Sequence, residues 1–157
     1  MSERYDVQLA DAQATESLGE RIALLLRAGD LVILSGDLGA GKTTLVKGVG
    51  RGLDVRGPIT SPTFVVARRH PSLVDGPDLL HVDAYRLRSR AELDDLWLDH
   101  QGTVTVVEWG RGLVDDLAAS RLEIDLEEAG DGRMARIAVH GARWDAIDLS
   151  VLGRDGA

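Results

Sequence analysis

The chain has 157 residues, of which 44% are hydrophobic and 28% charged, so we expect one globular domain, 1–157, and neither a disordered nor a fibrous protein. Since it contains no cysteine, disulfides, thiolate zinc sites and cysteine nucleophiles are excluded, and a reducing, cytoplasmic location is favoured. Eighteen Lys and Arg against 26 Asp and Glu give a formal net charge of −8, which argues against a chain that binds nucleic acid on its own.

No segment of the sequence predicts a membrane span or a secretory signal. Residues 1–6 are mostly polar, and the longest helix-like apolar run, 22–26, is far shorter than the roughly 20 residues that cross a bilayer. We therefore expect a cytoplasmic protein without membrane contact.

The first third of the chain predicts a strand, a helix, a second strand and a second helix. Residues 5–9 alternate weakly, as in an edge strand, and apolar residues then recur at helical spacing from 14 to 26 until Gly29 offers a stop. The apolar run 31–34 is typical of a strand buried on both faces of a parallel sheet. After a glycine-rich turn, a helix is expected from Thr44 to near Gly50 or Gly52.

The middle of the chain predicts a loop over 57–62 and a strand over 63–67. Residues 79–83 form another short apolar segment that ends in an acid. The capping-box pattern Ser89-Arg90-Ala91-Glu92 predicts a helix over 90–98. The β-branched run 103–107, followed by Glu108, predicts a second central strand.

The last third predicts a β-hairpin, because 122–126 and 135–139 alternate in polarity on either side of a turn at 130–132. Trp144 and Ile147 would share one face of a short helix in a tail that frays beyond Leu152. Together these elements predict an α/β fold, with a mostly parallel central sheet flanked by helices and extended by a C-terminal antiparallel hairpin.

The segment Gly36–Thr43 matches G-x-x-x-x-G-K-[ST], and it lies between a buried-strand candidate and a helix, as a P-loop requires. Its glycines would let backbone N–H groups face a phosphate, while Lys42 reaches the β- and γ-phosphates and Thr43 ligates magnesium. A bare glycine turn is the alternative. It would need one of only two lysines in the chain to fall at this position by accident. We therefore predict a P-loop NTPase-like fold.

The composition also bears on which nucleotide is bound. Guanine specificity in small GTPases depends on an Asn-Lys-x-Asp loop, and this sequence has no asparagine. ATP is therefore the expected nucleotide. An ABC-type ATPase is disfavoured, since the chain is short and lacks an LSGGQ-like signature.

A P-loop enzyme needs a further acid near magnesium and a group that orients the attacking water. Asp83 and Glu108 compete for these roles, since both follow strands whose carboxyl ends would lie at the same sheet edge as the P-loop. Each could instead be a solvated acid at a strand end. The hydroxyl groups of residues 60–63 are typical either of a loop that closes over a γ-phosphate or of a plain turn. Trp109 is either a core residue or an exposed contact residue. His81 is expected to be a packed side chain.

Four motifs in this order and spacing resemble the TsaE family, the bacterial ATPase required for threonylcarbamoyl-adenosine modification of tRNA. They are Gly36 to Thr44, Ser61 to Phe64, His81 to Leu87 and Val107 to Trp109. The opening helix, at 13–15 and 18–20, is also similar, so the resemblance covers roughly residues 5 to 145.

The resemblance implies an accessory ATPase that uses ATP and Mg²⁺, hydrolyses ATP slowly in isolation and acts on a TsaD–TsaB pair. TsaD transfers the threonylcarbamoyl group, so this chain would meet tRNA only indirectly, through the complex. Lys42 would hold the phosphates, Thr43 and Glu108 would hold magnesium, and Asp83 would act near the γ-phosphate or its water.

The remaining nucleotide contacts that the resemblance implies are Asp11 and Thr15, beside the adenine, and Gly36, Gly39, Ala40, Gly41 and Thr44 around the phosphates. The sequence departs from the family pattern at Gly110-Arg111, where an acidic or amide residue is often found. Arg111 is thus either a nucleotide contact or a bystander.

Two other classes of function use the same motif. A small-metabolite kinase could grip an anionic acceptor with Arg86, Arg88 and Arg90, although a solvated helix start explains these arginines more simply. A nucleotide-gated binding module would bind ATP with negligible hydrolysis. Product analysis separates the three classes.

Overall fold

A computed structural model describes residues 3–36, 41–59, 67–84, 90–97, 100–108 and 118–153 of the chain. Its helices are α1 (Ala12–Ala23), α2 (Lys42–Leu53) and α3 (Arg90–Trp97), with the 3₁₀ turns η2 (His100–Gly102), η3 (Ala142–Trp144) and η4 (Leu149–Gly153). Its strands are β1 (Glu3–Leu9), β2 (Leu31–Gly36), β3 (Ala67–His70), β4 (Asp78–Asp83), β5 (Thr103–Glu108), β6 (Arg121–Ala129) and β7 (Gly132–His140).

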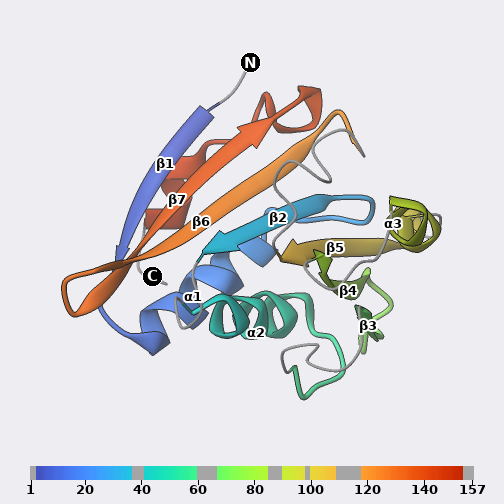
Figure 1. Cartoon of the computed structure of the whole chain (residues 1–157), viewed down its shortest axis with the longest axis horizontal. Helices are drawn as coiled ribbons and strands as arrows, with labels where there is room; N and C mark the ends of the chain where they lie inside the picture. The colour runs from blue at the N-terminus through green and yellow to red at the C-terminus, as the bar shows by residue number, and fades with distance from the viewer. Residues whose placement is uncertain are drawn as a thin grey trace.

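Over the described ranges, seven strands form one sheet in the order β1-β7-β6-β2-β5-β4-β3 (Figure 1). β2 is central and runs parallel to both of its neighbours, β5 and β6. Its first four residues are buried, as expected for an apolar strand that is covered on both faces. The α/β class and the added C-terminal hairpin, β6 and β7, are confirmed.

The expectation of a mostly parallel sheet is wrong, because the described strands make as many antiparallel pairs as parallel ones. The pairs β2-β5, β2-β6 and β4-β5 are parallel, whereas β1-β7, β6-β7 and β3-β4 are antiparallel. Both edges of the sheet are therefore antiparallel. At one edge β1 pairs with the hairpin strand β7, and at the other edge a short turn joins β3 to β4.

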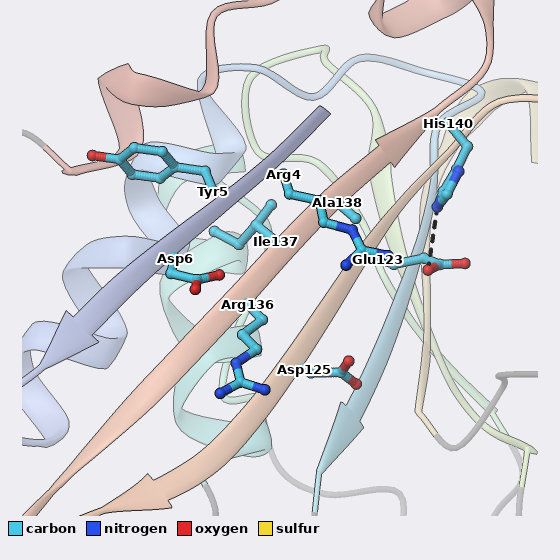
Figure 2. Close-up of a pocket in the computed structure, with 9 residues that line it drawn as sticks. All are labelled: Arg4, Tyr5, Asp6, Glu123, Asp125, Arg136, Ile137, Ala138 and His140. Atoms are coloured by element: carbon cyan, nitrogen blue, oxygen red, sulfur yellow. Dashed lines mark ion pairs between the residues drawn. The ribbon is translucent and has the colours of Figure 1, made fainter. Parts of the chain in front are cut away.

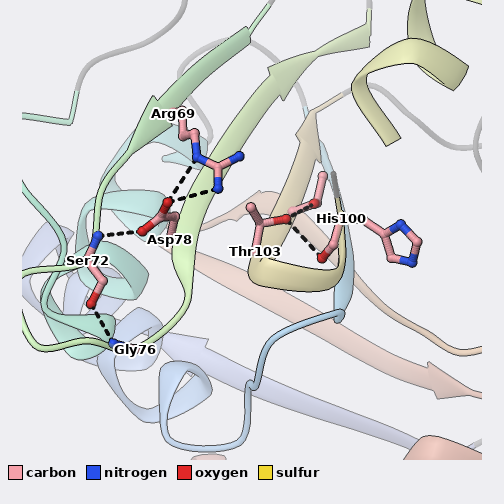
Figure 3. Close-up of polar contacts among 7 residues, drawn as sticks. Arg69, Ser72, Gly76, Asp78, His100 and Thr103 are labelled. Atoms are coloured by element: carbon pink, nitrogen blue, oxygen red, sulfur yellow. Dashed lines mark hydrogen bonds and ion pairs between the residues drawn. The ribbon is translucent and has the colours of Figure 1, made fainter. Parts of the chain in front are cut away.

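The turn between β3 and β4 is held by Asp78 (Figure 3). Its carboxylate accepts from the Ser72 backbone N–H at 2.7 Å and from Arg69 Nε at 2.9 Å. These contacts, the Ser72 N–H first and Arg69 second, lower the pKa of Asp78. A connection this short permits only antiparallel pairing, since a parallel pair needs a longer crossover.

Helices α1 and α2 lie on one face of the sheet (Figure 1). α1 and α2 pack against each other and bury Leu18, Ile22 and Val46 in the core cluster on one face. On the other face, Trp97 of α3 packs against a second cluster that includes Ile33. Of the helices in the described ranges, none has the length and apolarity required to span a bilayer.

Two helix boundaries differ from the predicted ones. α1 ends at Ala23 rather than near Gly29, because the N–H groups of residues 24–26 bond to carbonyls three residues earlier and tighten the last turn. α2 begins at Lys42, two residues before the predicted start at Thr44, and continues through Gly50 to Leu53. Its end at Leu53 directly follows Gly52, one of the two predicted end points, whereas Gly50 lies inside the helix.

The C-terminal segment packs as short turns on the core rather than as one helix. Trp144 is buried in η3, and Ile147 packs beside the same core cluster. Leu152 is fully buried and its carbonyl accepts from Arg21 Nε at 2.9 Å. The predicted fraying beyond Leu152 falls, after Gly153, outside the described residues, as do most of the predicted strand 63–67 and the end of helix 90–98.

Candidate functional site

The predicted phosphate segment connects β2 to α2. β2 ends at Gly36, and α2 begins at Lys42 after Gly41, whose φ of +100° lies in the region that favours glycine. Gly41, the N-cap residue of α2, has no side chain that could cap the helix. The backbone N–H groups and positive dipole end of this helix are therefore available to an anion. Gly39 and Ala40 lie outside the described residues.

Lys42 lies against the end of the central strand. Its side chain is buried, and Nζ donates to the backbone carbonyl of Gly36 at 2.5 Å. An ammonium group withdrawn from water requires such partners, because burying an unpaired charge is costly. The side chain thus spans the two ends of the predicted phosphate loop. Thr43 and Thr44 follow it in the first turn of α2, both half-buried.

Asp83 and Glu108 are the last residues of β4 and β5, and the register of these parallel strands pairs them directly. Glu108 is also in register with Leu34, two residues before the end of β2. Glu108 is buried and Asp83 half-buried. Since Val106 and Leu34 pack on the α1 and α2 face, strand alternation directs both acids to that same face. Lys42, Asp83 and Glu108 therefore share one edge of the sheet.

His81 is packed, as expected, but it also has a polar contact that sequence reasoning missed. It precedes Asp83 by two residues on the same face of β4, and its Nε2 contacts Glu108 Oε2. The His-x-Asp spacing in a strand could have signalled a shared face. The partner could not be deduced, because it depends on the register between β4 and β5.

A second buried histidine, His70, lies on β3. Its Nδ1 is 3.2 Å from the carbonyl oxygen of Arg56, so the ring donates there. Burial lowers the pKa of His70 below its ordinary value of 6.5, and the Arg56 hydrogen bond opposes that shift. His70 thus stays neutral over a wider pH range than a solvated histidine.

The start of α1 lies beside the start of α2. Asp11 caps α1 by accepting from the Ala14 N–H at 2.8 Å, and the buried Thr15 donates to the Asp11 carbonyl at 3.3 Å. A methyl group placed on Gly41 would lie 3.7 Å from Thr15 Cγ2. The structure therefore brings the Asp11 to Thr15 segment next to the predicted phosphate loop, although the Asp11 carboxylate is used as a helix cap.

Several predicted site residues lie outside the described residues: Gly39, Ala40, Ser61 to Phe64, Arg86, Arg88, Trp109 and Arg111. In the ranges that the structure does describe, no three His, Cys, Asp or Glu side chains gather as a metal site.

A hollow of about 650 Å³ lies on the sheet away from these residues (Figure 2). Basic and acidic side chains of β1, β6 and β7 line it, among them Arg4, Arg136 and Asp125, and His140 pairs with Glu123 across 3.4 Å. Lys42, Asp83 and Glu108 do not line it.

Comparison with known proteins adds to this geometry. The family model described as "Threonylcarbamoyl adenosine biosynthesis protein TsaE" matches residues 9–136. The chain belongs to the TsaE family. The resemblance read from the four sequence motifs is thereby confirmed, and this TsaE-family chain belongs to the system of tRNA threonylcarbamoyladenosine biosynthesis.

Relatives of the chain carry the same description, "tRNA threonylcarbamoyladenosine biosynthesis protein TsaE". A Streptomyces coelicolor protein is 56% identical over 143 residues, which cover 86% of this chain and 97% of the relative. A Mycobacterium bovis protein is 47% identical over 138 residues, covering 81% and 82%. A solved structure titled "Crystal structure of Bacillus subtilus YdiB" superposes with a TM-score of 0.77 at 28% identity, covering 96% of this TsaE-family chain and 95% of that chain.

Proposed function

We propose that this chain binds and hydrolyses ATP with Mg²⁺ and that this activity supports tRNA threonylcarbamoyladenosine biosynthesis by acting on a TsaD–TsaB-like pair in the cytoplasm. The observation that carries the proposal is the buried Lys42 at the start of α2, in contact with Gly36 and at the same sheet edge as Asp83 and Glu108. The chemistry of phosphoryl transfer requires these groups together.

The start of α2 fits a phosphate. It offers backbone N–H groups after an N-cap glycine, a positive dipole end, and the Lys42 ammonium beside them. These features favour an anion, and they follow a central parallel strand, the place where α/β sheets bind ligands. Gly36, Gly39, Ala40, Gly41 and Thr44 would surround the phosphates.

The same edge fits magnesium. This ion is commonly held by one or two carboxylates together with substrate phosphates, rather than by a cage of protein ligands alone. Thr43 and Glu108 would hold it, and Asp83, the register partner of Glu108, would orient water near the γ-phosphate. Bound magnesium would supply charge neutralisation at the phosphates. Asp11, Thr15 and Arg111 are the proposed contacts to the rest of the nucleotide.

The test of this site compares the two lysines of the chain, which lie on the same helix. Lys42→Ala removes charge-assisted hydrogen bonds to phosphate, each worth roughly 1.5 to 3 kcal/mol, so ATP affinity or turnover should fall by about one to two decades. Lys47→Ala is the control, because Lys47 is exposed on α2 and should leave both unchanged. Calorimetry that finds equal ATP affinity and equal phosphate release in both variants would overturn the site.

The partner is tested separately from the site. A net charge of −8 disfavours tRNA binding by the chain alone, while Trp109 is a residue type common at the centre of protein interfaces. We expect negligible tRNA affinity at physiological salt and nucleotide-dependent association with a TsaD–TsaB pair, which Trp109→Ala should weaken more than it weakens ATP binding. Tight tRNA binding by the chain alone, with no binding to the pair in sedimentation, would contradict this. A phosphorylated metabolite in place of free phosphate would instead indicate a kinase.

A further inference from the structure

His81 is completely buried, with 0% of its surface exposed. It lies on β4, whose neighbours are β3 and β5. A histidine in such a place is expected either to anchor backbone groups or to serve another side chain. The contacts of the ring distinguish these two roles.

The ring's polar contacts lead to one residue. Nε2 contacts Glu108 Oε2, while Nδ1 is buried and has no hydrogen-bond partner among the described residues. In the part of the chain that the structure describes, Glu108 is thus the polar partner of this ring. A carboxylate oxygen accepts, so Nε2 carries a hydrogen and donates it, and in a neutral ring Nδ1 then holds a lone pair. The ring ties down no backbone group.

Glu108 has a physical need for this donor. It is only 5% exposed at the end of an otherwise apolar and Thr-containing strand, and a carboxylate in such surroundings is stable only when hydrogen-bonded. One N–H bond to Oε2 fixes the rotamer of the carboxylate and engages one of its two oxygens. Since the contact with His81 uses Oε2, Oε1 is the oxygen that would bind an ion.

We infer that His81 is a positioning residue that holds Glu108 through its Nε2–H, so that the second carboxylate oxygen is presented to magnesium. The inference rests on the proposed function, in which Glu108 holds the ion. It gives the His81-x-Asp83 spacing a purpose, because one face of β4 then supplies both the support for Glu108 and the neighbouring acid Asp83. Partners of this kind, behind a metal ligand, commonly contribute about ten- to a hundredfold in metal affinity.

The first experiment replaces His81 by Gln or by Asn, two amide side chains of different length. The amide nitrogen of Gln can take the place of Nε2, whereas that of Asn is nearer to the place of Nδ1. ADP affinity is measured by calorimetry at a series of Mg²⁺ concentrations, which gives the Mg²⁺ midpoint. We expect His81→Asn to raise this midpoint about ten- to a hundredfold and His81→Gln to keep it near that of the wild type. A structural role alone would not produce this rescue.

His70→Asn is the matched control. His70 is also a buried histidine, on the adjacent strand β3, but its ring hydrogen-bonds to the Arg56 carbonyl and not to Glu108. The Asn amide can replace its donating Nδ1. This variant should therefore leave the Mg²⁺ midpoint unchanged.

The second experiment needs neither nucleotide nor metal. A ¹H–¹⁵N spectrum of the histidine rings in the free protein should place the proton of His81 on Nε2 and that of His70 on Nδ1. Glu108→Gln should shift the His81 signals and leave those of His70 in place. A His81 proton on Nδ1 would overturn the inference. If His81→Asn does not fold, this spectrum decides, since it uses the native histidine.

The outcomes separate the two proposals. Wild-type protein without Mg²⁺-dependent ADP binding would overturn the proposed function and this inference with it. Wild-type protein with Mg²⁺-dependent binding, but with an unchanged midpoint in His81→Asn, would overturn the inference alone. In a Glu108→Gln background, replacing His81 should change the midpoint no further, because its action passes through Glu108.

Discussion

Gly48→Ala should force apart the two helices that cover one face of the sheet. The β-carbon of an alanine at this position of α2 would lie 2.0 Å from the Glu16 carbonyl oxygen of α1. Gly19 of α1 approaches α2 in the same way, since a β-carbon there would lie 2.3 Å from the Leu45 carbonyl oxygen. The two glycines let the helix backbones touch.

The size of the effect follows from these distances. Real β-carbons stay beyond 3.0 Å of such an atom, so the backbones must separate by roughly 1 Å. A gap of that size forfeits about a quarter to a half of the dispersion energy of each contact, and overpacking typically costs about 1 to 3 kcal/mol. The upper end applies, because the obstacle is backbone. Replacing a helical glycine by alanine raises helix stability by about 1 kcal/mol, so the free energy of unfolding should fall by a net amount of about 2 kcal/mol.

The assay is thermal unfolding followed by circular dichroism. For a chain of this length about 2 kcal/mol lowers the melting temperature by roughly 4 to 8 °C. Gly50→Ala is the matched control in the same helix, with the same propensity gain. Its β-carbon would also meet an atom at 2.0 Å, but that atom is Ile59 Cδ1, the mobile tip of a side chain. Equal melting temperatures for the two variants, or a Gly48→Ala protein at least as stable as the wild type, would refute this reasoning.

Two further predictions concern the acids and the buried histidine. Glu108→Ala should weaken the Mg²⁺ dependence of nucleotide binding, whereas Asp83→Asn should leave binding largely intact and lower turnover; the reverse pattern in calorimetry and phosphate release would mean that their roles are exchanged. Burial lowers the pKa of His70, so near pH 6.5 the histidine is protonated in the unfolded chain but still neutral in the folded one. The free energy of unfolding therefore falls as the pH drops below that value, by at most about 1.4 kcal/mol per pH unit. His70→Asn keeps a donor to Arg56 and cannot titrate, so urea unfolding at pH 7.5, 6.5 and 5.5 should give a flatter profile than the wild type, and identical slopes would contradict the prediction.

The sequence by itself determined the elements whose signals are local. Four successive apolar residues at 31–34 suffice for a central strand, because a strand covered on both faces has no polar side to present. Alternation on both sides of the 130–132 turn suffices for a hairpin, and it is present. The spacing of Gly36, Gly41 and Lys42 between a strand and a helix likewise located the candidate phosphate loop, since a motif of neighbouring residues needs no long-range contact to be recognised.

Tertiary structure alone decided what depends on contacts between distant segments. The direction of an edge strand is set by the partner it finds, so the antiparallel pairing of β1 with β7 was invisible in residues 3–9. Gly50 is one of the two predicted ends of its helix, yet it lies inside α2, where Ile59 packs against it. The contact between His81 and Glu108 has the same origin: it requires two strands, 27 residues apart, to settle in one register, and hydrophobic burial across the whole sheet selects that register.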